Sequence, residues 1–211
     1  MSTPDSVSTF VHYRLARLAD IDDLMQLIAL SVESIGSRYY SPEQLASSLE
    51  YVFGVDRQLI ADGTYYVAER VREAQGTKES SDPRPEIIGC GGWSMRRRLF
   101  GKDSASWNGD PAEPLNPAIE PARIRAFFVH PDWARRGIAR ALLELSEQAA
   151  RARGFRTFEL AATLMGEPMY ARCGFIELER IDYELPDGVH LPVVRMLKPL
   201  VPAGHSELHA V

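Results

Sequence analysis

The sequence predicts an α/β (α+β) fold in which helices flank one mixed β-sheet. The central observation is a strand–helix–strand unit: residues 124–129 and 156–162 are short apolar runs, and an amphipathic stretch separates them. The apolar positions of that stretch recur at helical spacing, at Ile138, Leu142, Leu145 and Ala149. A strand–helix–strand unit places its two strands parallel, so at least one parallel pair is expected.

A C-terminal hairpin and several N-terminal strands and helices complete the predicted fold. Residues 175–185 and 190–196 are strand-like, and the turn residues Pro-Asp-Gly separate them. Before the central unit we expect strands, a helix N-capped by Asp20, and a helix that begins with a capping box at Ser41. The expected early strands cover residues 12–18, 64–69 and 86–95. With a short helix over 166–173, the order is β-α-α-β-β-β-α-β-α-β-β.

The strand at 86–95 is unusual because it contains Gly89, Gly91 and Gly92. Glycine inside a strand indicates a bulge or a close approach by another backbone. Residues 96–121 then form a long insertion rich in Gly, Asp, Asn and Pro, which is typical of a functional or irregular loop. Residues 75–85 also predict a polar loop.

Length and charge limit the class of protein. A chain of 211 residues with 45% hydrophobic residues predicts a single domain over 1–211, with loose tails at 1–10 and 199–211. The net charge of −5 argues against a general nucleic-acid surface. The 2 cysteines show no metal-binding spacing, so we expect no metal and a reducing, cytoplasmic setting. The polar start and the absence of a run of ~20 apolar residues predict an unexported protein outside the membrane.

The turn at 130–140 is the strongest functional signal. It leads from a buried strand into the amphipathic helix, so it forms a helix N-terminus with unpaired backbone N–H groups and a partial positive charge. Gly137 lets a ligand approach the backbone, and Arg135, Arg136 and Arg140 add positive charge. This pattern favours a phosphate site; the alternative is that the arginines are merely solvated at the start of a surface helix.

Two motifs carry a resemblance to a known family. Val129-x-Pro131 followed by Arg135-Arg136-Gly137-Ile138-Ala139-Arg140-x-Leu142-Leu143 resembles motif A of the GNAT superfamily of acyl-CoA-dependent N-acetyltransferases, although Ala134 stands where the family has Gln or Arg. Met169-Tyr170-x-x-Cys173-Gly174-Phe175 is similar to the family's C-terminal pattern. The resemblance implies the GNAT fold, a mixed and mostly antiparallel sheet of about seven strands, and acetyl-CoA as co-substrate.

The resemblance also implies roles for particular residues. The backbone near Phe127 and Val129 would bind the pantetheine arm of coenzyme A, and Tyr170 would protonate the leaving thiolate. The pyrophosphate would bind the amides of the turn, at Arg135, Arg136, Gly137, Ile138, Ala139 and Arg140. Tyr39, Tyr40 and Trp93 are candidates for the acceptor pocket, with core packing as the alternative.

The function expected from this resemblance is acetyl transfer from acetyl-CoA to a primary amine of a small molecule or peptide by direct attack. The general base is left open among Glu33, Glu43, Glu159 and His130. The resemblance also suggests a homodimer. Two other classes are weighed: a non-catalytic acyl-CoA sensor of the same fold, which Tyr170 argues against, and a nucleic-acid module, which the acidic net charge disfavours.

Overall fold

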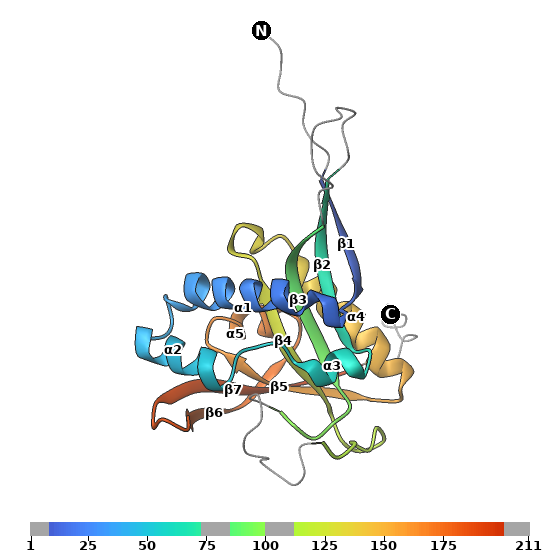
Figure 1. The fold of residues 1–211 in the computed structure, drawn as a ribbon. Helices are drawn as coiled ribbons and strands as arrows, with labels where there is room; N and C mark the ends of the chain where they lie inside the picture. Colours follow the sequence, from blue (N-terminus) through green and yellow to red (C-terminus); the bar gives the residue numbers. More distant parts are fainter. Residues whose placement is uncertain (1–8, 73–84, 100–111, 201–211) are drawn as a thin grey trace, which may run out of the picture.

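A computed structural model of the protein describes residues 9–72, 85–99 and 112–200 (Figure 1). The described strands are β1 (Thr9–Leu15), β2 (Tyr65–Arg72), β3 (Glu86–Ser94), β4 (Ala122–Val129), β5 (Thr157–Thr163), β6 (Ile176–Glu184) and β7 (His190–Pro199). The described helices are α1 (Ile21–Gly36), α2 (Pro42–Tyr51), α3 (Arg57–Ala61), α4 (Ile138–Ala152) and α5 (Glu167–Arg172), with 3-10 turns at Leu18–Asp20 and Pro131–Trp133. The predicted order is confirmed, and α3 is an additional helix.

The strands form one 7-stranded sheet in the order β1-β2-β3-β4-β5-β7-β6. Its neighbours pair antiparallel, except that β4 and β5 pair parallel across the strand–helix–strand unit. The predicted mixed, mostly antiparallel sheet is therefore confirmed.

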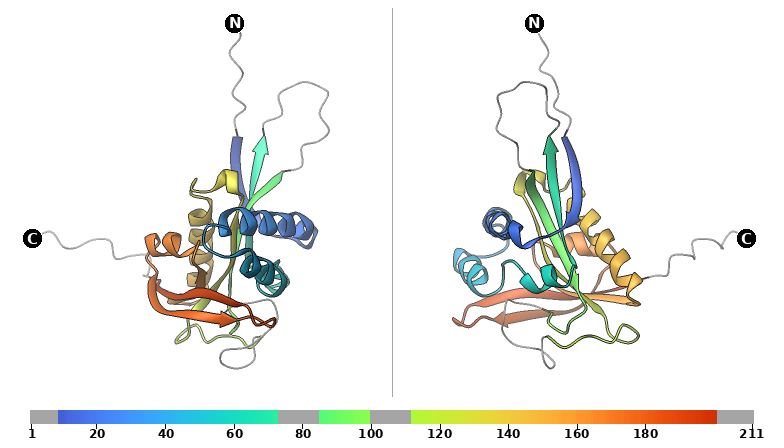
Figure 2. Two further views of the ribbon diagram at one scale, coloured as in Figure 1. Left: turned by 90° about the vertical axis from the view of Figure 1, so that its left-hand side faces the viewer. Right: turned by 45° about the vertical axis from the view of Figure 1, so that its right-hand side comes forward.

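Helices cover both faces of the sheet (Figure 2). On one face, Leu24 and Ile28 of α1 and Leu59 of α3 pack against sheet residues such as Tyr65 in one core cluster. On the other face, α4 and α5 pack against β3, β4 and β5 in two further clusters. The burial of α1 follows the helical spacing that the sequence predicts, at Leu24, Leu27, Ile28, Ser31 and Val32.

The helix ends agree largely with the sequence signals. Ser41 accepts a hydrogen bond from the Gln44 amide (3.2 Å), and the Gln44 side chain accepts one from the Ser41 amide (2.9 Å), so the capping box is confirmed. Gly154 and Gly174, with φ of 86° and 88°, follow the ends of α4 and α5 in the left-handed region that favours glycine.

The first strand is shifted from its predicted bounds. It covers Thr9–Leu15 rather than 12–18, and the chain turns after Leu15. Asp20 explains the turn: its carboxylate pairs with Arg14 (2.7 Å) and accepts a hydrogen bond from the Arg17 amide (2.7 Å). Asp20 occupies the N-cap position of α1 without capping that helix by its side chain, because the carboxylate closes the preceding 3-10 turn instead.

The glycines of β3 meet a bulge in β4, as predicted. The register between the strands shifts between Cys90 and Gly92, where Ala126 of β4 has a φ of 55°. A Cβ atom on Gly91 would lie 2.7 Å from the Phe127 ring, and one on Gly92 would lie 2.5 Å from the Thr64 carbonyl oxygen. Only glycine therefore lets β2, β3 and the bulge of β4 pack this closely.

The segments expected to be loops are partly outside the described residues, at 1–8, 73–84, 100–111 and 201–211. Within the insertion, Arg96 forms a β-bridge with Pro114, and Leu115 is buried. The C-terminal strand extends to Pro199, and the buried Leu200 donates its amide hydrogen to the Arg156 carbonyl (2.7 Å). The predicted start of the tail at 199 is therefore too early.

An ion-pair group joins β4 to β5 where they meet. The two strands pair only at Ala122–Phe158 and Arg123–Glu159. The Glu159 side chain is 4% exposed and pairs with both Arg123 and Arg195 of β7. These contacts connect three strands at the point beyond which β4 and β5 diverge.

We predict that Glu159→Gln destabilises the protein by about 3 kcal/mol, because it leaves the Arg123 guanidinium buried without its counter-charge. Chemical denaturation measures the free energy of unfolding. The matched control is Glu179→Gln, since Glu179 pairs with the same Arg195 (2.7 Å) but is 49% exposed. The control should lose less than about 1 kcal/mol; equal losses in the two variants would contradict a special role for Glu159.

Candidate acetyl-CoA and acceptor site

A cavity of about 620 Å³ occupies the opening between β4 and β5. Residues 124–129 of β4 line one side, and residues 160–163 of β5 line the other. Ala139 of α4 and Tyr170 of α5 reach it from one face of the sheet, whereas Ser31 of α1 and residues 56–59 reach it from the other. The cavity therefore connects the two faces of the sheet through the gap between the strands.

The C-terminal end of β4 presents backbone groups to this opening. The His130 amide donates to the Ile88 carbonyl (2.9 Å), which makes the adjacent Val129–Gly89 pair a non-hydrogen-bonded pair of the ladder. The N–H and C=O of Val129 consequently point away from β3, toward the side on which β5 has separated. Phe127, two residues earlier, presents its ring to the cavity.

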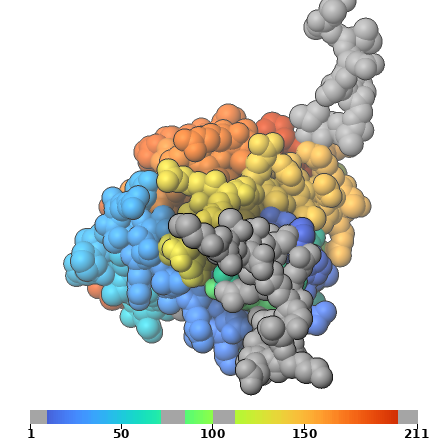
Figure 3. Space-filling model, turned by 90° about the horizontal axis from the view of Figure 1, so that it is seen from above, coloured from blue at the N-terminus to red at the C-terminus, as the bar shows by residue number. Residues whose placement is uncertain are grey.

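The turn before α4 gathers unpaired amides. Arg135 and Gly137 have φ of 62° and 85°, and the first amide to bond back is that of Ala141, which donates to the Gly137 carbonyl (2.9 Å). The amides of residues 135–140 donate to no acceptor among the described residues. The turn lies on the surface of the molecule, in yellow in Figure 3. Unpaired N–H groups at the positive end of a helix dipole are the arrangement that can bind an anion.

Three arginines surround the same turn. Arg136 lies over the Trp133 ring, 4.9 Å from its centroid, and Arg140 pairs with Glu144 (2.9 Å). Arg135 is exposed. The side chains therefore add positive charge at the surface, while the backbone provides the directed donors. A Cβ atom built on Gly137 would have no heavy atom within 4 Å, so the space beside this residue is open.

Tyr170 of α5 is packed among aromatic rings beside the cavity. Its ring packs edge-to-face against Phe127 (6.2 Å between centroids) and Phe175 (5.4 Å). The side chain lines the cavity, and its hydroxyl forms no hydrogen bond with a described residue. Burial raises the pKa of Tyr170 above its ordinary value, so the phenol keeps its proton at neutral pH.

Residues 116–191 match the family model described as Acetyltransferase (GNAT) domain. This stretch, about a third of the chain, is similar to a GNAT acetyltransferase domain. A comparison with curated protein sequences gives no significant match.

Solved structures of N-acetyltransferases share this fold at low sequence identity. A GCN5-related N-acetyltransferase from Rhodopseudomonas palustris is 20% identical, with a TM-score of 0.58 over 92% of this chain and 98% of that one. The PaiA N-acetyltransferase from Thermoplasma acidophilum, solved with coenzyme A, is 13% identical, with a TM-score of 0.54 over 90% and 99%. The ribosomal-protein-S18-alanine N-acetyltransferase from Escherichia coli is 14% identical, with a TM-score of 0.51 over 95% and 100%.

Tyr39, Tyr40 and Trp93 are not among the residues that line the cavity. Tyr39 is 46% exposed on the surface, and Trp93 is buried against Phe155 (5.8 Å between centroids). Tyr40 is buried, and burial raises its pKa to about 12. The buried surroundings of Tyr40 and Trp93 agree with the core-packing alternative.

The groups considered as general base are also elsewhere. Glu33 and Glu43 are exposed, Glu159 is held between two arginines, and His130 accepts a hydrogen bond from the Asp132 amide (3.2 Å). None of the four lines the cavity. Asp56 supplies the one carboxylate among the described residues that line the cavity, and the sequence analysis did not identify it. The sequence signal for Asp56 was weak, because Asp56 is the N-cap of a helix of only 5 residues. Its carboxylate accepts hydrogen bonds from the Gln58 (3.1 Å) and Leu59 (3.2 Å) amides.

The described residues provide no activated cysteine and no metal centre. Burial raises the pKa of Cys90 to about 12, and burial also raises the pKa of Cys173. No group of three or more His, Cys, Asp or Glu side chains in 9–72, 85–99 and 112–200 could hold a metal ion. Over the same ranges, no helix has the length and apolar character needed to cross a membrane.

We predict that Tyr40→Phe lowers the free energy of unfolding by about 2 kcal/mol. The Tyr40 hydroxyl donates to the Pro192 carbonyl (2.8 Å) and accepts from the Leu164 amide (2.8 Å), so the variant leaves two backbone groups without their partner. Tyr39→Phe is the matched control and should change stability by less than about 0.5 kcal/mol. Unchanged stability in Tyr40→Phe, measured by denaturation, would contradict a structural role for this hydroxyl.

Proposed function

We propose that this chain transfers the acetyl group of acetyl-CoA to an amine by direct attack. The observation that carries the proposal is the continuous cavity between β4 and β5, which runs from the Val129 backbone past Tyr170 to Asp56 on the opposite face. Acetyl-CoA supplies a thioester that is already activated toward an amine. Two reactants that enter from opposite faces of the sheet would meet beside Tyr170.

Coenzyme A would bind along β4 and the start of α4. The amides of residues 135–140 are suited to the pyrophosphate, since they are directed donors at the positive end of a helix dipole. The outward N–H and C=O of Val129 are suited to an amide of the pantetheine arm, which would extend the sheet where β5 is absent. Backbone donors also explain how the site tolerates Ala134 in place of the family's Gln or Arg.

Tyr170 would act as the general acid. In the transfer step, a bond forms between the amine nitrogen and the carbonyl carbon of the acetyl group, and the bond from that carbon to sulfur breaks. The nitrogen loses one proton and the sulfur gains one. Burial keeps this phenol protonated before the step, so it holds a proton that the departing sulfur could accept.

The attacking amine requires a neutral nitrogen. An alkylamine with a reference pKa near ~10.4 is neutral in only about one molecule in 10³ to 10⁴ at pH 7. Water in the cavity would accept the proton, since the described Asp56 carboxylate is already engaged by two amides and by Arg125 (2.9 Å). The raised pKa of both described cysteines also favours direct attack over an acyl-enzyme.

We predict that Tyr170→Phe lowers kcat by about 10²-fold while the affinity for acetyl-CoA changes less than about threefold. The variant keeps the ring that packs on Phe127 and Phe175 and removes the proton donor. Thiol release measures turnover, and calorimetry measures binding, with Tyr39→Phe as the control. Turnover equal to wild type would remove Tyr170 from the mechanism. Binding without turnover in the wild type, across amines of every charge class, would favour the sensor alternative.

We predict that Gly137→Val weakens acetyl-CoA binding by at least about tenfold, because a β-branched residue cannot keep a φ of 85° and the amides of the turn would lose their common direction. Gly188→Val is the matched control: Gly188 has a φ of 82°, and it too has no neighbour within 4 Å of its would-be Cβ. Both variants should lose similar stability, but the control should keep its affinity for acetyl-CoA. Equal affinities would contradict the phosphate assignment.

A further inference from the structure

On the face of the sheet that carries α1, the cavity exposes part of the hydrophobic core. The apolar lining residues of this face come from the chain between α2 and α3, from α3, and from β4 and β5. They belong to one core cluster or pack against it: Val52, Phe53, Val55, Leu59, Ala126, Phe128 and Ala161. The core of this face is therefore open to the cavity along one side.

An aromatic pair forms part of this lining. The rings of Phe53 and Phe128 pack edge-to-face with 5.7 Å between their centroids, and both residues line the cavity. Ile35 of α1 lines it too, and its side chain is half-buried. Rings and branched aliphatic side chains offer a ligand van der Waals contacts but no hydrogen bonds. This lining therefore suits the apolar part of a ligand.

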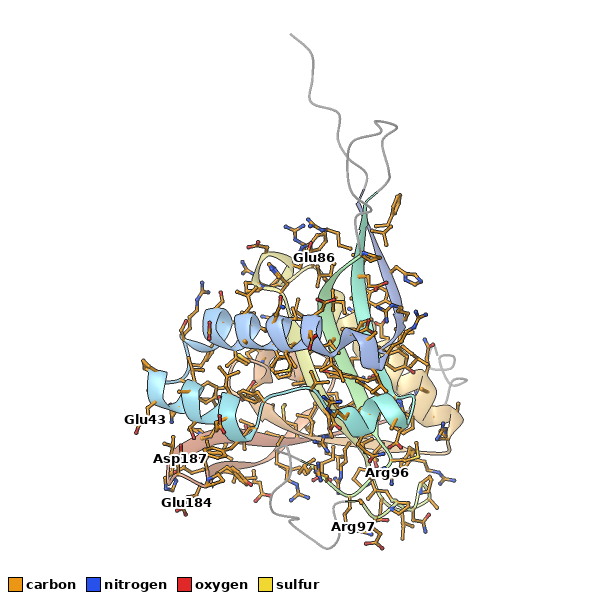
Figure 4. All side chains as sticks on the ribbon, viewed as in Figure 1. Glu43, Glu86, Arg96, Arg97, Glu184 and Asp187 are labelled. Carbon is orange, nitrogen blue, oxygen red and sulfur yellow. The ribbon has the colours of Figure 1, made fainter. Side chains whose placement is uncertain are left out.

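The charged lining groups on this face interact with other protein groups. The Asp56 carboxylate accepts two backbone amides and pairs with Arg125 (2.9 Å). Arg96, which Figure 4 shows on the chain that follows β3, holds Asp62 through two hydrogen bonds of 2.8 Å. Arg98 and Arg125 have further interactions with the protein. Since Asp56 is the one carboxylate among the lining residues of the described chain, an acceptor with a second ammonium group finds no unengaged carboxylate there.

An uncharged polar group on this face has no partner in the described chain. Ser31 of α1 is 2% exposed and lines the cavity, and its hydroxyl forms no hydrogen bond with a described residue. A hydroxyl can form a hydrogen bond with a neutral amine nitrogen. It does not replace the counter-charge that a second buried ion would need.

The proposed coenzyme A site uses the other face of the sheet. The Phe127 ring and Tyr170 belong to the clusters on the α4 face, and the turn before α4 provides the amides for the pyrophosphate. Phe53 and Phe128 belong to the cluster on the α1 face. The thioester would thus approach from one face and leave the apolar lining of the other to the acceptor.

We propose that the acceptor is a monoamine with an uncharged, apolar body, an alkylamine or arylalkylamine, and that an apolar wall binds this body. The apolar wall consists of Ile35, Val52, Phe53, Val55 and Phe128. This inference rests on the proposed acetyl transfer and narrows its acceptor. The charge on the reacting nitrogen is lost before the attack, whereas a second charge would stay buried against apolar side chains at a cost in free energy.

Acceptors of matched length test the requirement for an apolar body. In the series propylamine, butylamine and pentylamine, each added methylene should raise kcat/KM by about two- to fourfold. Pentylamine should exceed 1,5-diaminopentane and 5-aminopentanoate by at least about tenfold in kcat/KM. The three compounds share a five-carbon chain and a primary amine, so the difference reports the group at the far end.

A carboxylate placed in the apolar wall should reverse this order. Ile35→Glu should lower kcat/KM for pentylamine by about tenfold and favour 1,5-diaminopentane, because the new carboxylate pairs with the second ammonium group. Leu30→Glu is the matched control, since Leu30 lies in the same helix, is 42% exposed and does not line the cavity. The control should keep the wild-type order. Calorimetric affinity for acetyl-CoA, unchanged in both variants, verifies that each is folded.

The outcomes separate this inference from the proposed function. Acetylation of 1,5-diaminopentane or 5-aminopentanoate with a kcat/KM equal to or above that of pentylamine would overturn the apolar acceptor and leave acetyl transfer standing. If no amine is acetylated, acetyl transfer fails, and calorimetric binding of the same compounds to the acetyl-CoA-loaded protein decides the preference. Tighter binding of pentylamine that is lost in Ile35→Glu and kept in Leu30→Glu would support the apolar wall, and equal binding would overturn it.

Discussion

The divergence of β4 and β5 is the constraint on which the cavity depends. Two adjacent parallel strands normally continue pairing, because unpaired backbone groups inside a sheet are costly. Here pairing stops after Arg123–Glu159, and the buried Glu159 ties β4 to β7 through Arg123 and Arg195. The ion-pair group thus holds the strands together at one point and leaves the backbone beyond it available to a ligand.

The bulge in β4 determines which side chains face the cavity between β4 and β5. Gly91 and Gly92 allow β4 to bulge at Ala126, and the Phe127 ring then packs against both β3 and Tyr170. The Tyr65 hydroxyl, which lies 3.4 Å from the Ala126 carbonyl, supports the same bulge from the other face. Residues on three strands therefore position the one phenol that lines the described cavity.

Local signals made much of the fold and the turn before α4 predictable. Helical spacing and the arginine–glycine turn indicate α4 and its amides, because both are determined by neighbouring residues. The Asp56 side of the cavity was not predictable in this way: α3 is only 5 residues long, and Asp56 meets Arg125 through tertiary packing. The sequence could not decide whether Trp93 faces a pocket or the core, because β3 is buried on both faces and its burial does not alternate along the strand.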